Sequence, residues 1–255
     1  SSPTPPFTAN KPGSTHTTPP RQSHFLAAGG LRYYVYCGLA ARREGTMARK
    51  SGSLTPRSSR TQVDEFIKQV ATRPALRPEA ARGRLIFALD ATASRQPAWD
   101  RACHIQAEMF NETAALGGLE VQMAYYRGFG EFRAGSWSAN SHDLVRQMGA
   151  VYCLGGHTQI ERVLRHAIDE TRKKAVNALV FVGDCMEEDV DGLCQLAGEL
   201  GMLRVPAFVF QEGQEPVARQ AFEQIARLSG GAYCSFDASS AQQLRELLSA
   251  VAVYA

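Results

Sequence analysis

The chain has 255 residues, of which 44% are hydrophobic and 21% are charged. A chain of this length and apolar content can bury one sizeable core or at most two small ones, which excludes disorder throughout and a small disulfide scaffold. The formal net charge of +3 averages over two unlike regions. Residues 1–60 contain nine lysines and arginines against one acid, whereas residues 61–255 contain nineteen against twenty-four. The basic character therefore lies near the start, and the remainder of the chain is acidic.

Residues 1–60 are predicted to form a disordered basic leader. Residues 1–24 are rich in serine, threonine and proline, a composition that buries too little apolar surface to offset chain entropy. Met47 opens a start of its own, so residues 1–46 are interpreted as an upstream extension or a non-native leader. The basic residues are not interleaved with aromatic ones, so we expect no nucleic-acid binding. Residues 61–82 are predicted to form a short helix and a proline-containing linker.

Cysteine content and hydropathy predict the cellular compartment of the protein and whether it has a membrane-spanning segment. The six cysteines show neither a C-x-x-C pair nor zinc-ligand spacing, and most lie in apolar runs, where cysteine acts as a small core residue. The longest uncharged apolar stretch near the start, residues 33–41, is about half as long as a membrane span requires. We therefore expect a cytoplasmic protein without a membrane-spanning segment.

From residue 83 the sequence alternates short apolar runs with amphipathic segments. The apolar runs predict strands over 85–89, 119–126, 178–182, 206–210 and 232–236. The amphipathic segments predict helices over 98–116, 143–148, 159–174, 190–200, 217–228 and 241–251. Residues 128–137 are predicted to form a hairpin-like excursion. Because the strands are apolar on both faces and alternate with helices, we predict an α/β domain over 83–255 with a doubly wound, mostly parallel open sheet flanked by helices.

Three predicted loops of this domain carry oxygen ligands. Asp90, Thr92 and Ser94 form a D-x-T-x-S run directly after the first strand. Asp184 follows the third predicted strand, and Thr158 follows a glycine pair at the start of an amphipathic helix. In open parallel sheets, ligands bind beyond the carboxyl ends of the strands. Two carboxylates and three hydroxyls form the all-oxygen shell that Mg²⁺ or Mn²⁺ prefers, in contrast to zinc or copper.

Taken together, these residues resemble the metal-ion-dependent adhesion site (MIDAS) of the von Willebrand factor A (vWA) domain family. The family pattern is D-x-S-x-S after the first strand, a threonine before a middle helix and an aspartate after the fourth strand. The resemblance covers about residues 83–253 and implies a Rossmann-like vWA fold. It also implies an Mg²⁺ ion held directly by the hydroxyls and largely through water by Asp90 and Asp184. One coordination position is left open for an Asp or Glu residue of a partner protein.

The sequence departs from the family pattern at two positions. Thr92 stands where a serine is commoner, which keeps the hydroxyl and adds a methyl group that stiffens χ1. Cys185 stands where a glycine usually follows the aspartate, and acids at 187–189 crowd the rim of this loop. Those acids either attract the cation or repel an acidic partner. Their simpler interpretation is the solvated start of the next helix.

Each site residue also has a simpler interpretation. Asp90 and Ser94 are ordinary N-cap residues for a following helix. Thr158, with Glu161 three residues later, fits a capping box, and Asp184 suits a plain turn. A cap and a metal ligand are compatible roles, because a cap hydroxyl at a helix start already faces the crevice beyond the strand ends.

The favoured function is a metal-dependent protein-binding module of a bacterial, cytoplasmic vWA type. We expect no enzymatic activity, because the sequence has no G-x-S-x-G, no P-loop and no supported Ser-His-Asp arrangement. Family analogy suggests association with an ATPase or a larger complex. Two alternatives stay open. One is an Mg²⁺-dependent phosphoryl-transfer enzyme with Asp90 as nucleophile and Asp184 as second carboxylate, and the other is a structural interaction domain with a vestigial metal site.

Overall fold

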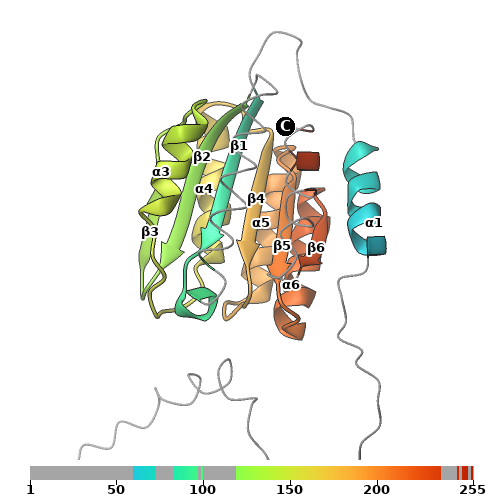
Figure 1. The fold of residues 1–255 in the computed structure, drawn as a ribbon. Coiled ribbons are helices and arrows are strands. Elements are labelled where there is room, and N and C mark those ends of the chain that lie inside the picture. Colours follow the sequence, from blue (N-terminus) through green and yellow to red (C-terminus); the bar gives the residue numbers. More distant parts are fainter. Residues whose placement is uncertain are drawn as a thin grey trace, which may run out of the picture. The chain divides into compact units, whose positions relative to one another are not determined.

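The computed structural model describes residues 60–72, 83–96, 99, 119–236, 246, 249–251 and 254, which include a six-stranded sheet (Figure 1). The strands stand in the order β3-β2-β1-β4-β5-β6. Their bounds are β1 (Gly83–Asp90), β2 (Leu119–Arg127), β3 (Glu131–Ala134), β4 (Ala178–Gly183), β5 (Ala207–Glu212) and β6 (Tyr233–Phe236). Strands β2 and β3 are antiparallel, and the other neighbouring pairs are parallel. The predicted doubly wound, mostly parallel sheet is confirmed.

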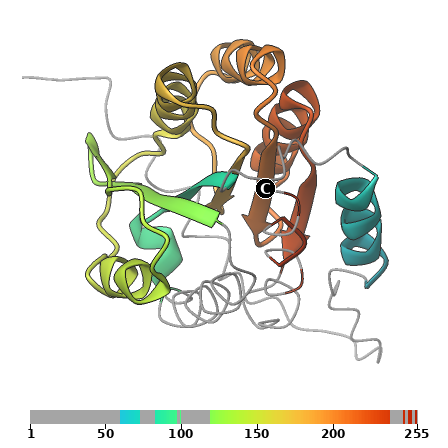
Figure 2. The same cartoon turned by 90° about the horizontal axis from the view of Figure 1, so that it is seen from above.

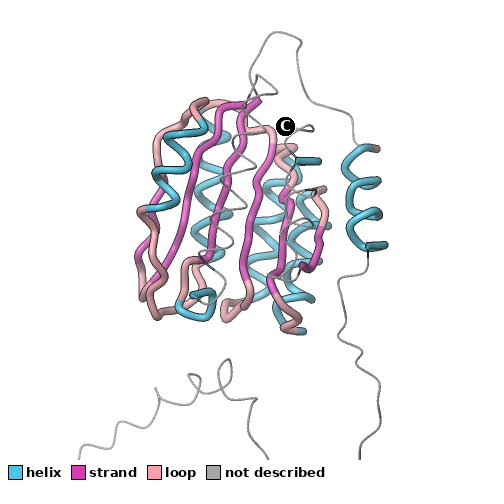
Figure 3. The backbone as a smooth tube through the Cα atoms, viewed as in Figure 1, coloured by secondary structure: helices cyan, strands magenta, loops and turns pink. Residues whose placement is uncertain are grey.

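Helices lie on both faces of this sheet. Those described are α1 (Arg60–Ala71), the short 3₁₀ helix η1 (Ala93–Arg95), α3 (Ser141–Gly149), α4 (Ile160–Lys173), α5 (Val190–Met202) and α6 (Pro216–Ser229). Figure 2 shows α4, α5 and α6 together on one face and α3 on the other, and in Figure 3 the same three helices lie behind the strands. Within the described ranges, no helix is long and apolar enough to cross a membrane.

Two predicted helices cannot be compared with the structure over most of their length. The helix over 98–116 lies outside the described residues apart from residue 99. The helix over 241–251 lies outside them apart from residues 246 and 249–251, which are helical.

Strand β1 occupies the centre of the sheet because both of its faces are apolar. All eight of its residues are buried. Leu85, Phe87 and Leu89 pack in the core on one face, and Ile86 and Ala88 pack in the core on the other. Burial on two faces is typical of a parallel strand that is covered by helices on both sides. Strand β1, which ends at Asp90, therefore contributes to the cores on both faces of the sheet.

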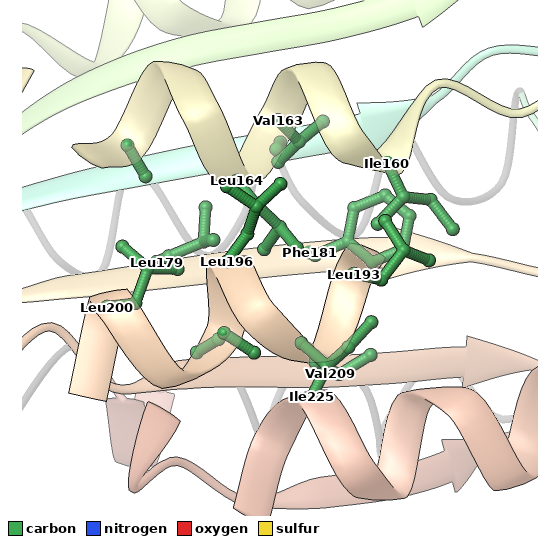
Figure 4. Close-up of a cluster of buried hydrophobic side chains, with 14 of the residues drawn as sticks. Ile160, Val163, Leu164, Leu179, Phe181, Leu193, Leu196, Leu200, Val209 and Ile225 are labelled. Atoms are coloured by element: carbon green, nitrogen blue, oxygen red, sulfur yellow. The ribbon is translucent and has the colours of Figure 1, made fainter. Parts of the chain in front are cut away.

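The core on the α4 side joins three helices to the sheet (Figure 4). Val163 and Leu164 of α4 are buried with Phe181 of β4, Leu196 of α5 and Ile225 of α6. Residues at i, i+3 and i+4 of a helix share one face, which is why the apolar spacing in this segment predicts a helix. The helix predicted over 159–174 is confirmed to within one residue at each end.

Helix α1 packs on the core of the other face. Val63, Phe66 and Val70 are buried there. The ring centroid of Phe66 lies 6.0 Å from that of Phe208 and 5.3 Å from that of Phe210, both on β5. Burial of one such phenyl ring stabilises the folded state by about 2–3 kcal/mol. The short helix predicted before the linker is present, and it contributes to this core.

The strand order positions the site. After β1 the chain continues to β2 on one side, and β4 pairs with β1 on the other side. The loops that leave β1 and β4 therefore diverge from adjacent strand ends, at the lower edge of the sheet in Figure 1. The hairpin predicted over 128–137 is confirmed by β3, and its turn places Gly128 and Gly130 at φ angles of 61° and 154° that favour glycine.

Candidate metal centre

Asp90 is the last residue of β1 and is fully buried. Its Oδ1 accepts a hydrogen bond of 2.7 Å from the backbone N–H of Thr92, which fixes the turn after the strand. Its Oδ2 accepts a hydrogen bond of 2.9 Å from the hydroxyl of Tyr126, which pairs with Asp90 in the register of β2. Each carboxylate oxygen has a second acceptor position, so Asp90 retains the capacity to bind a water molecule or a cation.

The two hydroxyl residues of the D-x-T-x-S run lie together. Thr92 Oγ1 and Ser94 Oγ are 3.1 Å apart and share a hydrogen bond. Thr92 is buried and Ser94 is exposed, in η1. Thr92 is the N-cap of η1 but its side chain makes no cap hydrogen bond to that helix. The Thr92 hydroxyl therefore lies beside Ser94 Oγ and is not used for helix capping.

Asp184 follows the end of β4, and one of its oxygens is buried without a donor. Oδ1 of Asp184 accepts no hydrogen bond within the described part of the chain. The end of β4 lies beside Asp90: a Cβ atom at Gly183 would lie 3.6 Å from the Cβ of Asp90, and it would clash with the ring of Phe181 at 2.8 Å. A buried carboxylate oxygen that lacks a donor is a strong acceptor, and a cation is a fitting partner for it.

The two carboxylates repel each other in a buried environment. Burial, and then the charge of Asp184, raise the pKa of Asp90 from its ordinary value of 3.8 to about 6. Burial and the neighbouring Asp90 also raise the pKa of Tyr126, so that its hydroxyl stays protonated and donates at neutral pH. A divalent cation between two carboxylates offsets this repulsion, which favours the charged form of both.

Thr158 is buried in the loop before α4 and bonds to the loop after β4. Its hydroxyl accepts a hydrogen bond of 3.0 Å from the backbone N–H of Glu187, and its own N–H donates to Oε2 of Glu187 at 3.2 Å. The capping-box alternative is wrong, because Gln159 is the N-cap of α4 and makes no side-chain cap hydrogen bond. Thr158 therefore connects two of the predicted site loops instead of capping its own helix.

The acids after β4 satisfy the starts of two helices. Glu188 accepts hydrogen bonds of 2.6 and 2.8 Å from the backbone N–H groups of Ile160 and Glu161 in α4. Asp189 is the N-cap of α5 and accepts from the N–H of Gly192. The predicted solvated helix start is therefore confirmed at Asp189 and wrong at Glu188, because the unpaired N–H groups of α4 attract the Glu188 carboxylate.

Backbone hydrogen bonds fasten the loop before α4 to the loops after β1 and β2. The N–H of Leu154 donates to the carbonyl of Ala91 at 3.0 Å, and the N–H of His157 donates to the carbonyl of Gly128 at 3.2 Å. A Cβ atom at Gly156 would overlap the backbone carbonyl of Gly128, so the close approach of the two loops requires glycine. The predicted site loops therefore meet at one edge of the sheet.

Arg95 directly follows the D-x-T-x-S run and is a site residue that sequence analysis did not single out. Its side chain is fully buried and donates to the carbonyl oxygens of Asp90 at 2.9 Å and Val182 at 3.5 Å. Two of its nitrogens donate to Oε2 of Glu212 at 3.1 and 2.7 Å. Although burial opposes it, the charges of Glu212 and Asp90 raise the pKa of Arg95, which stays charged. Arg95 therefore ties together the ends of β1, β4 and β5.

Two of the site residues missing from the prediction have a signal in the sequence. Tyr126 closes the second predicted strand, and Glu212 lies two residues after the fourth. Both are found by examining every strand end for polar groups, because the strand ends meet in the crevice. Arg95 gives no such signal, because an arginine in a loop is ordinarily exposed.

The donor set fits a hard divalent cation. In the described ranges, no group of three or more histidine, cysteine, aspartate or glutamate side chains could hold a metal ion, so a centre here depends on hydroxyls as well as carboxylates. The structure joins Asp90 to Thr92 and Thr92 to Ser94 by hydrogen bonds, and it sets the charge of Asp184 close enough to act on Asp90. It ties Thr158 to the loop that carries Asp184. Oxygen donors alone suit Mg²⁺ or Mn²⁺.

Neither a protein-family model nor a curated protein matches this sequence. Several solved structures resemble its fold. The SpRpn10 VWA domain is 12% identical with a TM-score of 0.53, over 66% of this chain and 94% of that one. A von Willebrand factor type A protein from Catenulispora acidiphila is 18% identical with a TM-score of 0.53, over 67% and 42%. Proximal thread matrix protein 1 from the mussel byssus, with a zinc-occupied MIDAS motif, is 14% identical with a TM-score of 0.55, over 68% and 46%.

These similarities concern the course of the backbone. The chain has the fold of vWA domains, with a mostly parallel six-stranded sheet between helices. The Rossmann-like vWA fold implied by the sequence resemblance is therefore confirmed. The candidate centre lies at the carboxyl ends of β1 and β4 in this fold, where open α/β sheets bind ligands.

Proposed function

We propose that this protein is a metal-dependent protein-binding module. Asp90, Thr92, Ser94, Thr158 and Asp184 hold an Mg²⁺ or Mn²⁺ ion, and an acidic residue of a partner protein completes the shell. The bound ion supplies positive charge and a coordination position that a carboxylate can take. The chain itself supplies a preformed cradle, because hydrogen bonds between the site loops fix the donors before any partner arrives.

The observation that supports this proposal most is the pair of carboxylates at the ends of β1 and β4. Oδ1 of Asp184 is buried without a donor among the described residues, beside an Asp90 whose pKa is raised to about 6. Placing like charges together in a buried crevice destabilises the folded state when no cation is bound. The buried guanidinium of Arg95 offsets part of this repulsion, and a bound cation would offset the rest.

We propose binding and not phosphoryl transfer. Asp90 is fully buried, and both of its oxygens accept hydrogen bonds, one from Thr92 and one from Tyr126, which makes it a poor nucleophile. The mussel byssus protein of similar fold has a zinc-occupied MIDAS motif, which supports the proposal of a divalent metal. We further propose a cytoplasmic setting and association with an ATPase or a larger complex.

Calorimetric titration of the full chain with Mg²⁺, in the absence of any partner, tests the metal site. Asp184→Asn removes the unpartnered carboxylate, and Ser94→Ala removes an exposed hydroxyl that supports no core contact. We expect each substitution to weaken Mg²⁺ binding at least about tenfold, because losing one ligand of a small octahedral ion removes about 1.4 kcal/mol or more.

Asp169→Asn is the matched control, because Asp169 is an exposed carboxylate on α4 whose side chain retains 63% of its accessible surface. This variant is expected to bind Mg²⁺ as the unsubstituted chain does. Circular dichroism of each variant separates loss of the ion from loss of the fold. Unchanged Mg²⁺ affinity in both folded site variants contradicts the proposal.

A further inference from the structure

Exposed apolar side chains gather on the loops beside the candidate metal centre. Phe129 retains 72% of its accessible surface, Tyr152 retains 59% and Leu154 retains 44%. Phe129 lies in the turn between β2 and β3, and the other two lie in the loop before α4. These three residues, here called the apolar rim, account for half of the large hydrophobic residues that are exposed within the described ranges. Large apolar groups concentrated at one rim mark an interaction surface.

The apolar rim is held rigidly against the metal-binding loop. Leu154 forms a parallel bridge with Thr92, and its N–H donates to the carbonyl of Ala91 at 3.0 Å. The guanidinium of Arg127 lies 4.0 Å from the ring centroid of Tyr152 and donates to the Tyr152 carbonyl at 3.1 Å. The ring of Phe129 contacts that of His157 at a centroid distance of 5.1 Å. A rigid surface loses little entropy when a partner binds to it.

The loop after β4 and the start of α5 carry negative charge. Glu187, Asp189 and Asp191 are exposed there and repel an acidic segment, and Glu187 lies 3.4 Å from Nδ1 of His157 in the loop before α4. The hairpin side carries exposed positive charge instead. Arg162 is exposed and donates to the carbonyl of Gly130 in the hairpin turn, whereas Arg133 on β3 is already paired with Glu131. A partner that brings an acidic residue to the metal therefore finds complementary charge on the side of the apolar rim.

We propose that the apolar rim binds a bulky aromatic or aliphatic side chain that neighbours, in the partner's sequence, the acidic residue given to the metal. This inference rests on the proposed function. Bridged strands lie about 5 Å apart, so Leu154 stands one strand spacing from the metal-binding Thr92. Consecutive residues of a polypeptide have Cα atoms about 3.8 Å apart, which suits one residue at the metal and the next on the rim. The occupant is thus a peptide segment with an Asp or Glu beside a large apolar residue.

Selection from a random heptapeptide display library tests the inference. The full chain is immobilised in 10 mM Mg²⁺ (about a hundredfold above a Kd near 0.1 mM, so that the site is filled), and bound peptides are sequenced. We expect enrichment of peptides in which Asp or Glu neighbours Phe, Tyr, Trp, Leu or Ile. The double variant Phe129→Ser and Leu154→Ser should lower the affinity of a selected peptide about tenfold or more, with unchanged Mg²⁺ binding by calorimetry.

Met202→Ser is the matched control, because Met202 is 80% exposed at the end of α5, at the opposite edge of the sheet. It should leave peptide affinity unchanged. Enriched peptides with an acid but no preferred apolar neighbour overturn this inference and leave the metal-dependent function standing. Peptides that bind equally well in EDTA overturn the proposed function and the inference together. Absence of any enrichment on the Mg²⁺-loaded chain also overturns the inference.

Discussion

The two edges of the sheet give their buried acids different partners. At the amino edge, Arg84 lies over the ring of Trp137 at 3.7 Å, and its Nη2 is 3.6 Å from Oε2 of Glu170. Glu170 also accepts hydrogen bonds of 2.7 Å from Trp137 and 2.8 Å from Lys173. At the carboxyl edge, two aspartates approach each other and one keeps a buried oxygen without a donor in the described part of the chain.

The pKa values of the buried acids at the two edges are shifted in opposite directions. Burial alone would raise the pKa of Glu170, but hydrogen bonds from Lys173 and Trp137 lower it below its ordinary value. For Asp90, burial and the charge of Asp184 act in the same direction and raise the pKa to about 6. The amino edge therefore pairs opposite charges, although Nε of Arg84 is buried without an acceptor among the described residues. The carboxyl edge instead sets two carboxylates side by side, and the charge of Arg95 offsets only part of their repulsion.

The largest expected effect comes from breaking the amino edge. Arg84→Ala removes a buried guanidinium that pairs with Glu170 and donates to the carbonyl of Lys174 at 2.6 Å. We expect the free energy of unfolding, measured by urea titration, to fall by about 3 kcal/mol, because a buried partner loses its counter-charge. Arg172→Ala is the control, because its side chain is 62% exposed and its ion pairs contribute about 0.5 kcal/mol. Equal losses in the two variants would show that the amino edge is not a buried network.

A substitution at the carboxyl edge is expected to raise the free energy of unfolding. In Asp90→Asn the amide still accepts from the N–H of Thr92, and the Tyr126 hydroxyl can turn to accept from the new NH₂ group. Because the raised pKa of Asp90, about 6 against 3.8, reflects an unfavourable buried charge, we expect the metal-free variant to gain about 1–3 kcal/mol at pH 8. The same variant should lose its stabilisation by Mg²⁺.

The pH dependence of that gain follows from the direction of the shift. A folded-state pKa above the unfolded value means that protonation of Asp90 stabilises the fold fully below about pH 4, and that this contribution is lost as the pH rises through about 6. The difference in unfolding free energy between Asp90→Asn and the unsubstituted chain should therefore be largest at pH 8 and small at pH 4. A variant that is less stable at pH 8 contradicts this account of the carboxyl edge.

A smaller effect on stability is expected from a loop glycine. A Cβ atom at Gly156 would overlap the backbone of Gly128, whereas one at Gly155 would meet nothing within 4 Å. Gly156→Ala should therefore displace the loop that carries Thr158, lower stability by about 1–2 kcal/mol and weaken Mg²⁺ binding, while Gly155→Ala leaves both unchanged. Thermal unfolding with and without Mg²⁺ measures the two effects. Identical behaviour of the two variants would mean that this loop does not position a ligand.

The features of the molecule that depend on local sequence pattern were predictable. The strands and their parallel order follow from short apolar runs that bury both faces, as in the run over 85–89. The position of Asp90 and Asp184 beyond two such runs was sufficient to predict that they share an edge. These features depend on local pattern, and in the structure Thr92 makes hydrogen bonds to both Asp90 and Ser94.

The features that escaped prediction depend on groups distant in the sequence. Local capping rules favour Thr158 as the cap of α4, but Glu188 from the next loop takes the helix N–H groups. The burial of Arg95 depends on Glu212, which is 117 residues away along the chain. The orphaned oxygen of Asp184 depends on the packing of its surroundings, and no single-sequence pattern carries that information.

Crystallographic location of Mn²⁺ by anomalous scattering tests the central claim most directly. Crystals of the full chain grown with Mn²⁺ should give an anomalous peak in contact with Ser94 and Thr92 and facing the orphaned oxygen of Asp184. The same crystals of Asp184→Asn should lose that peak. A peak at Glu187, Glu188 or Asp189 instead, or no peak at a saturating concentration of Mn²⁺, would contradict the assignment of this crevice as a metal centre.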